Sequence, residues 1–360
     1  MSEATAEAKP RSKFRKWLPK TILMIGGLVV VYLLFTQVFS KFGDFEAGFK
    51  AAMTIPVGWF IAIIVTSLFS IAVYPLTANA AVPGLKYKPA FIDRQAGLLI
   101  SSGVPWAGGP LAVGMQYKIL DTYGVERKRA AAAVAADAVW TYMMTFGLPA
   151  LSLLLLFVIE KKSIGTAYEI IAIVAAGIFL VTVGVIAIAL RSAKGAAKIG
   201  ALAEVPARWA FGIVKKTPPD IQTSVIGFHA TASDMIAKRW WPITWTNVLA
   251  QLSPMLVIFA ALFGMGGFPG DLSVLEVFVA YSVALLLASV PLAPGGLGTV
   301  DLALIGLLVL FGASSGQATA VDIIWRAFLY FPQMIVGLVA LMWFFWDRRK
   351  GRPKVAPVGA

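Results

Sequence analysis

The chain has 360 residues, of which 59% are hydrophobic and 14% are charged, and its mean hydropathy is +0.81. This composition excludes a water-soluble globular protein and predicts an all-α, polytopic integral membrane protein, because several windows exceed the roughly 18 apolar residues that span a bilayer. With no cysteine and one histidine, the chain is expected to bind no metal or other cofactor, and its net charge of +13 is distributed as membrane orientation requires, so no nucleic-acid partner is expected.

Basic residues set the predicted topology, since cytoplasmic loops of membrane proteins carry an excess of lysine and arginine. Residues 1–20 form a basic tail, and the uncharged run at 21–40 is interpreted as a retained first span, because no small-x-small cleavage site closes it. A second basic tail covers residues 347–360. Both tails are therefore expected on the cytoplasmic side of the inner (plasma) membrane.

Five further spans are predicted after the first, which makes six. In chain order they are expected at residues 51–85, 130–158, 170–190, 240–265 and 318–346. Between the fourth and the fifth, the basic and apolar residues of 191–239 are interpreted as amphipathic helices on the cytoplasmic surface. Residues 21–346 are thus predicted to form a single transmembrane domain.

Two other apolar segments are broken in the middle by proline and glycine. The first has arms at 95–104 and 111–120, which reach only about half of a 30 Å hydrocarbon core, and the second has arms at 277–290 and 299–312. We expect both to be re-entrant hairpins, although each could instead be two full spans without changing the chain's orientation. Basic residues flank the first hairpin, so it should open toward the cytoplasm, whereas the second should open outward.

The two breaks belong to an internal repeat. Residues 107–111 resemble 293–297, and the sequence Asp-x-x-Trp recurs at 137–140 and 322–325. The predicted repeats are residues 51–159 and 240–346, in opposite orientations. Inverted repeats with paired broken helices are typical of transporters, whose site lies between the repeats near the membrane midplane. Chance similarity among small apolar residues is the alternative.

The breaks supply the candidate substrate-binding residues. Backbone N–H groups at the start of a second arm, together with about half a positive charge from the helix dipole, suit a phosphate or carboxylate. The residues expected to bind such a group are Gly108, Gly109, Pro294, Gly295, Gly296 and Gly298. The alternative role of these glycines is close helix packing, which small residues commonly provide in membranes.

Four charged residues complete the candidate site. Arg326 is the one clearly intramembrane cation in this topology and should be paired, because a lone charge there costs at least about 2.5–3.5 kcal/mol. Asp322 and Asp301 are its candidate partners, in a structural salt bridge or in one that exchanges for a lipid phosphate. Asp137 has no basic residue nearby in sequence, so burial should favour its neutral form, as for a proton relay, or it caps a break.

A family resemblance follows from these motifs. The run Pro-Gly-Gly-Leu-Gly-Thr-Val-Asp at 294–301 and the run Trp-Arg-Ala-Phe-Leu-Tyr-Phe-Pro at 325–332 resemble the transmembrane region of lysylphosphatidylglycerol synthase and its stand-alone relatives. The resemblance implies a flippase-like lipid translocase that moves an anionic phospholipid or a lipid-linked glycan between leaflets. The family often has an Arg-Glu pair where this chain has Val300 and Asp301, so the acid is kept and the base is lost.

The resemblance does not extend to the synthase's chemistry. Only residues 347–360 follow the last predicted span, so no aminoacyl-transferase domain is expected and the chain is not expected to be an enzyme. No nucleophile elbow, phosphate-binding loop or metal-type histidine pair occurs. Two alternatives remain: an intramembrane lipid-modifying enzyme, and a non-transporting partner of the enzymes that assemble cell-envelope glycolipids.

Overall fold

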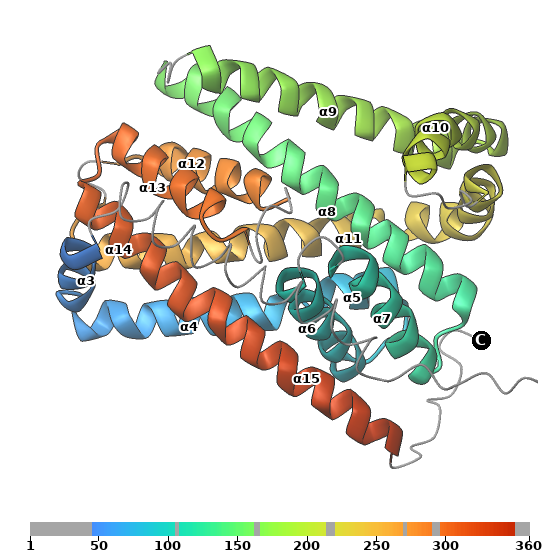
Figure 1. Cartoon of the computed structure of the whole chain (residues 1–360), viewed down its shortest axis with the longest axis horizontal. Coiled ribbons are helices and arrows are strands. Elements are labelled where there is room, and N and C mark those ends of the chain that lie inside the picture. The colour runs from blue at the N-terminus through green and yellow to red at the C-terminus, as the bar shows by residue number, and fades with distance from the viewer. Residues whose placement is uncertain are drawn as a thin grey trace, which may run out of the picture.

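A computed structural model of the chain describes residues 45–104, 108–161, 166–213, 220–268, 272–289 and 296–349 (Figure 1). The predicted first span, the N-terminal basic tail, residues 350–360 of the C-terminal tail and most of the second break, including Pro294 and Gly295, lie outside these residues. Every regular element within the described ranges is a helix, which confirms the all-α prediction.

The helices follow one another with short connections. Their bounds are α3 Phe45–Met53, α4 Val57–Val73, α5 Leu76–Ala81, α6 Tyr87–Gly103, α7 Gly108–Thr122, α8 Arg127–Leu155, η2 Leu156–Glu160, α9 Thr166–Arg191, α10 Ala193–Ile213, α11 Ile221–Gly264, α12 Val274–Ala288, α13 Thr299–Phe311, α14 Ser315–Trp325, η4 Arg326–Tyr330 and α15 Phe331–Arg349. The two η elements are π-helical turns that continue a longer helix.

Four helical stretches in the described part of the chain are long and apolar enough to cross a membrane. They are Val57–Ala81, Arg127–Glu160, Lys238–Gly264 and Ser315–Arg349, and they coincide with the predicted second, third, fifth and sixth spans. The predicted fourth span falls on α9, which contains a shorter apolar stretch at Ala176–Ile186. The chain is therefore a multi-span membrane protein, and the total of six spans stays a prediction.

Both predicted broken segments form helical hairpins. Helices α6 and α7 pack on each other as hairpin one, and α12 and α13 pack on each other as hairpin two. Their helices have 17, 15, 15 and 13 residues, which is about 20–26 Å at 1.5 Å per residue and less than a full hydrocarbon core. The first helix of hairpin one begins at Tyr87, well before the predicted arm start at 95.

The second helices of the two hairpins end in the same way. A glycine with positive φ follows each, Gly124 after α7 and Gly312 after α13. The next residue, Val125 or Ala313, donates its N–H to a carbonyl five residues earlier at 3.0 Å in both cases. This is a Schellman turn, in which glycine takes the left-handed conformation that ends a helix. The local sequence similarity therefore corresponds to the same backbone structure.

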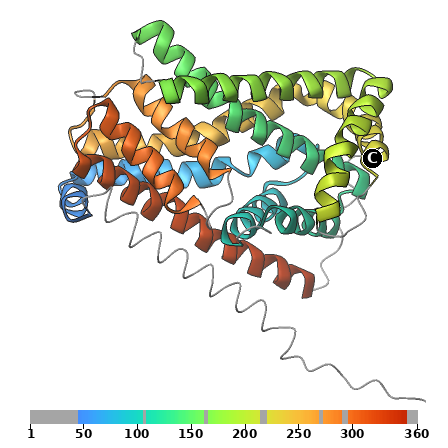
Figure 2. The same ribbon diagram turned by 45° about the horizontal axis from the view of Figure 1, so that its top comes forward.

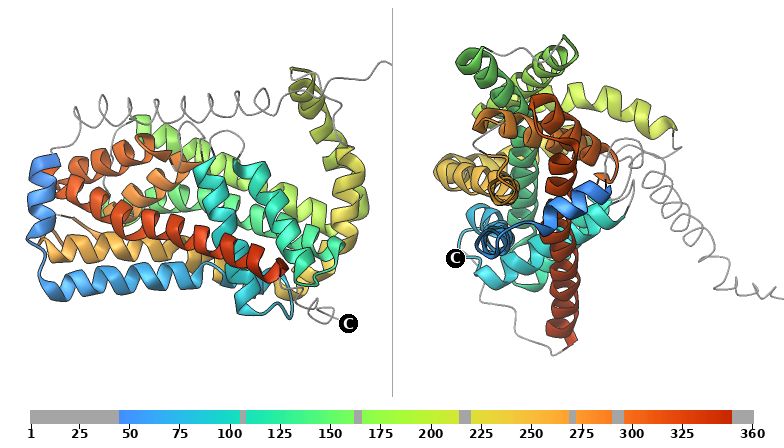
Figure 3. Two further views of the ribbon diagram at one scale, coloured as in Figure 1. Left: turned by 60° about the horizontal axis from the view of Figure 1, so that its bottom comes forward. Right: turned by 90° about the vertical axis from the view of Figure 1, so that its left-hand side faces the viewer.

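The long helices form a bundle with one hairpin toward each end (Figures 1 and 3). Helix α4 packs along α11, α8 packs on α11 and hairpin two, and α15 packs on α6 of hairpin one. Helix α10 and the start of α11 lie at the same end as hairpin one (Figure 2). The largest cluster of buried apolar side chains joins α11, α12, α13 and α14, and so holds hairpin two against the long helices.

Candidate functional site

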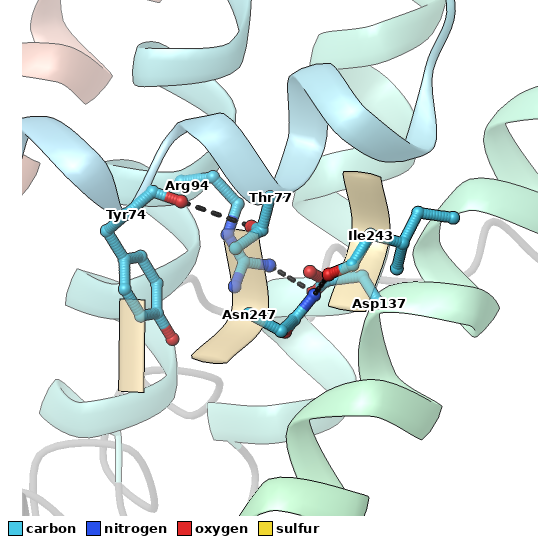
Figure 4. A network of polar contacts seen from close by, with 6 residues as sticks. All are labelled: Tyr74, Thr77, Arg94, Asp137, Ile243 and Asn247. Atoms are coloured by element: carbon cyan, nitrogen blue, oxygen red, sulfur yellow. Dashed lines mark hydrogen bonds and ion pairs between the residues drawn. The ribbon is translucent and has the colours of Figure 1, made fainter. Parts of the chain in front are cut away.

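Hairpin one contains a buried ion pair. Nη1 of Arg94, on α6, donates to Oδ2 of Asp137, on α8 (Figure 4). The Arg94 side chain is 8% exposed and that of Asp137 is 13% exposed. The guanidinium also lies over the ring of Tyr74, with 4.6 Å between its carbon and the ring centroid, in a cation–π contact. The pair therefore joins hairpin one to two of the long helical stretches.

This ion pair corrects two expectations. Asp137 does have a cationic partner, and Arg326 is not the one buried cation of the chain. Arg94 was assigned to the cytoplasmic basic flank because the apolar arm was taken to begin at residue 95. Because α6 begins at Tyr87, Arg94 lies two turns inside the helix and faces the protein interior.

Other polar groups surround the pair. Asp93 is 2% exposed, precedes the arginine of the pair in the chain and lines a small pocket together with both members of the pair. Gln95 donates to the carbonyl of Ile71 at 2.9 Å, and Asn247 donates to that of Ile243 at 2.9 Å. Both side chains are buried. The Gln95 bond joins α6 to α4, whereas the Asn247 bond lies within α11. Both bonds satisfy buried polar groups, which are stable only when they are hydrogen-bonded.

A small pocket opens beside the pair, between α5, α6, α7 and α8. It is lined by Ala78, Ala81, Val82, Asp93, Arg94, Gln116, Leu120, Ala133, Val134 and Asp137. Most of its wall is apolar, and the charged groups converge at one place. Its free space, about 10 Å³, is roughly that of one water molecule beside the charges.

Hairpin two contains a second buried ion pair. Nε of Arg326, at the start of η4, donates to Oδ1 of Asp301, on α13, at 2.6 Å. The side chains are 8% and 1% exposed, respectively. Asp301 also accepts the N–H of Gly298 at 2.6 Å through Oδ2, and so caps the N-terminus of α13. Arg326 thus has a charged partner, as its position required.

Asp322 and two aromatic rings complete this second cluster. The carboxyl of Asp322, one turn before Arg326 on α14, lies within hydrogen-bonding reach of that of Asp301. The rings of Trp325 and Tyr330 have centroids 5.1 and 5.2 Å from the guanidinium carbon of Arg326. The structure therefore brings Arg326, Asp301 and Asp322 together, whereas Asp137, on α8, pairs with Arg94 of hairpin one.

The candidate glycines serve the backbone in different ways. A Cβ on Gly108 would lie 2.4 Å from the carbonyl oxygen of Ser101, so the two helices of hairpin one meet closely there. Gly109 is exposed and has open space around it. Gly296 and Gly298 have φ of 66° and 90°, which other residues rarely adopt. Anion binding at these positions stays a prediction, and one N–H of the second break is already held by Asp301.

The two ion pairs contain the same two residue types, but the residue that the hairpin supplies differs between them. We call Asp93, Arg94 and Asp137 cluster one, and Asp301, Asp322 and Arg326 cluster two. In cluster one the hairpin supplies the arginine, and in cluster two it supplies the paired aspartate. Each cluster has two carboxyls and one guanidinium. Asp93 and Arg94 were missed from the sequence, where the run Asp-Arg-Gln next to an apolar arm was the available signal.

Hydroxyl groups join helices in the interior of the bundle. Ser253 donates to Ser70 at 2.9 Å, joining α11 to α4, and Ser152 and Ser282 are hydrogen-bonded at 2.8 Å, joining α8 to α12. Tyr281 of hairpin two donates to the carbonyl of Gln251. These contacts place hydrogen-bonded polar groups in the interior of the bundle.

Comparison with known proteins gives one result. Residues 23–337 match the family described as the lysylphosphatidylglycerol synthase TM region. A search of curated proteins found no match. The matched range includes both hairpins and both clusters. The chain therefore belongs to the lysylphosphatidylglycerol synthase TM region family.

Proposed function

We propose that this chain is a lipid translocase that moves an anionic phospholipid or a lipid-linked glycan between the two leaflets. The observation that carries this proposal is the presence of two buried Arg–Asp pairs, each with one member in a hairpin, where the two hairpins lie toward opposite ends of the bundle. Membership of a family named for the membrane region of a lipid-modifying enzyme supports a substrate that is a lipid.

Buried charges are poor structural elements, which favours a functional role. Charged side chains at membrane depth are costly, rare and usually associated with substrate or ion pathways. A buried ion pair is often no more stabilising than a well-packed apolar pair of similar volume. Two such pairs in one bundle therefore call for a role that apolar residues cannot fill.

The proposed mechanism exchanges the partner of each arginine. A guanidinium presents N–H donors in a fixed fork that matches a phosphate as well as a carboxylate. When hairpin one opens, the headgroup phosphate takes the place of Asp137 at Arg94, while Arg326 stays paired with Asp301. When hairpin two opens, the roles reverse, and the phosphate leaves from Arg326 on the other side. The acyl chains stay in the bilayer throughout.

Leaflet exchange by the purified chain tests the proposal. Liposomes that contain fluorescent phosphatidylglycerol are treated with a membrane-impermeant quencher, which reaches the outer leaflet only. We expect the chain to make the inner-leaflet fluorophore accessible, and Arg326→Ala to slow this exchange by about 10–100-fold, the equivalent of one charge-assisted hydrogen bond of about 1.5–3 kcal/mol. The control is Arg127→Ala, whose side chain is 90% exposed.

The same liposomes separate the alternatives. A covalent change in the lipid, detected by mass spectrometry, would indicate a lipid-modifying enzyme. Neither exchange nor modification, with any of several anionic lipids, would contradict both and favour a partner of glycolipid-assembly enzymes. Undiminished exchange by a correctly folded Arg326→Ala variant would remove cluster two from the mechanism.

A further inference from the structure

Each cluster has one carboxyl more than it has guanidinium groups. Asp93 and Asp322 are the additional acids, each is 2% exposed, and each adjoins an ion pair that is itself buried. With all groups ionised, each cluster would carry one uncompensated negative charge in the interior of a membrane protein. Such a charge is very unfavourable, and a buried acid normally avoids it by taking up a proton or a cation.

The geometry of cluster two indicates where a proton lies. The carboxyls of Asp322 and Asp301 are within hydrogen-bonding reach of each other. An ionised carboxylate can only accept a hydrogen bond, so two carboxyls can form one only if one of them is protonated. Both oxygens of Asp301 already accept a hydrogen bond, Oδ1 from Arg326 and Oδ2 from Gly298, which leaves the proton to Asp322.

Cluster one has the same imbalance. Oδ1 of Asp93 and Oδ1 of Asp137 are buried, and neither receives a hydrogen bond from a donor in the described residues. Arg94 is directed to the other oxygen of Asp137. Asp93 is therefore a buried acid that adjoins a small pocket and lacks a donor for one of its oxygens. A proton on Asp93 would make this cluster neutral.

Within the described ranges, few other charged groups lie near either cluster. Asp322 is influenced by Asp301 from α13 and Arg326 from η4, while Glu46 and Lys50 of α3, which packs on α14, pair with each other at the surface. Asp93 is influenced by Arg94 and by Asp137 from α8.

Five more charged residues lie on α15 and α7, which pack on α6. Asp347 of α15 is paired with Lys88, at the start of α6. The other four are exposed, namely Arg348 and Arg349 of α15 and Lys118 and Asp121 of α7. None of these charges therefore replaces a proton at either cluster.

We propose that each cluster is a proton-binding site, with the proton on Asp322 in cluster two and on Asp93 in cluster one. The consequence for transport rests on the proposed function. When a phosphate takes Arg326 from Asp301, the released carboxylate keeps a hydrogen bond from protonated Asp322. Loss of that proton to water favours return of the arginine and release of the lipid. Proton binding and headgroup exchange are then linked at each hairpin.

Infrared spectroscopy tests proton binding without any transport measurement. A protonated carboxyl has a carbonyl absorption that is separate from those of carboxylates and amides and that shifts in heavy water. In nanodiscs at neutral pH, the wild-type chain should show this absorption, and Asp93→Asn and Asp322→Asn should each remove part of it. Asp121→Asn, at an exposed aspartate, is the control and should remove none.

The results that overturn the proposal are equally direct. A wild-type spectrum without protonated carboxyls at neutral pH would do so, and this measurement does not depend on the folding of any variant. Correctly folded Asn variants that leave the absorption unchanged would also do so, because the signal would then come from other acids. Buried Glu276 and Asp347 make this comparison of variants necessary.

A second measurement addresses the link to transport. In liposomes, an imposed pH difference should change the rate of phosphatidylglycerol exchange by the wild-type chain, and Asp322→Asn should lose that response. If the wild-type chain moves no lipid, the proposed function fails while the infrared result still decides whether the clusters bind protons. If lipid exchange occurs but ignores pH in the wild type, the link is wrong.

Discussion

Each buried arginine lies among two aspartates and at least one aromatic ring, and these neighbours explain the choice of residue. Arg94 faces Tyr74, and Arg326 faces Trp325 and Tyr330. A guanidinium stays charged at any physiological pH, stacks on rings and holds a carboxylate in a defined geometry, whereas a lysine ammonium loses its charge more readily when buried. These are the properties that a reversible, membrane-buried anion site requires.

Stability measurements at cluster one distinguish the effect of losing one charge from the effect of losing the whole ion pair. Arg94→Met leaves Asp137 and Asp93 buried without a cation, so we expect a loss of about 3–5 kcal/mol. Arg94→Met combined with Asp137→Leu removes the pair and leaves an apolar contact, so it should be more stable than the single variant. Thermal unfolding in detergent, followed by tryptophan fluorescence, measures both. A double variant no more stable than Arg94→Met would contradict this description of the pair.

At the scale of elements, hairpin one depends on a close crossing with α15. A Cβ on Gly337 would lie 2.6 Å from the carbonyl oxygen of Gln95 and 2.7 Å from Cβ of Leu99. Further along, Lys88 and Tyr123 bond the same carboxylate oxygen of Asp347 at 2.8 and 3.0 Å. Both helices of hairpin one are thus attached to α15, the helix that continues from Arg326.

Gly337→Ala should therefore lower the stability of the fold by more than the addition of one methyl group suggests. The contact is with backbone, so α15 and α6 must separate, at a cost of about 1–3 kcal/mol. Gly114→Ala, on α7, meets open space and should be neutral or slightly stabilising, because alanine favours helix over glycine. Unfolding temperatures of the two variants provide the measurement. Equal effects would show that the crossing is not close in the membrane.

The hairpins also show what the sequence can predict. Hairpin two was expected at 277–290 and 299–312, close to the observed α12 and α13, because its arms contain no basic residue and a single acid, Asp301, and glycines mark the break. The structure adds a capping box of Ser273 and Glu276 at the start of α12. In hairpin one the arm was expected to begin at residue 95, because the charged residues at 93–94 normally indicate exposure to water. Helix α6 begins at Tyr87 instead.

The candidate site was predicted to a similar extent. Arg326, Asp301 and Asp322 could be grouped because they lie in one motif, and the structure brings them together. The Arg94–Asp137 pair joins residues 43 positions apart on two helices. Whether a charge is buried depends on where its partner lies after folding, and spacing along one chain does not carry that information.

At the scale of the whole molecule, the two hairpins lie toward opposite ends of one bundle, and the ion pairs that they share with other helices have exchanged charges. This arrangement suits a carrier in which one hairpin is closed by its ion pair while the other is open. Helix α15 packs on hairpin one and continues from the helix that carries Arg326, so movement at one end can be transmitted to the other.

Lipid exchange by variants of both arginines tests this arrangement most directly. If the lipid must pass both clusters in turn, Arg94→Met and Arg326→Met should each reduce phosphatidylglycerol exchange by about 10–100-fold. The double variant should be no slower than the slower single variant, because a block at either end is sufficient. Rates measured in the same liposomes, with each variant shown to be folded, give the answer. Undiminished exchange by the folded double variant would contradict a role for the two ion pairs in lipid transport.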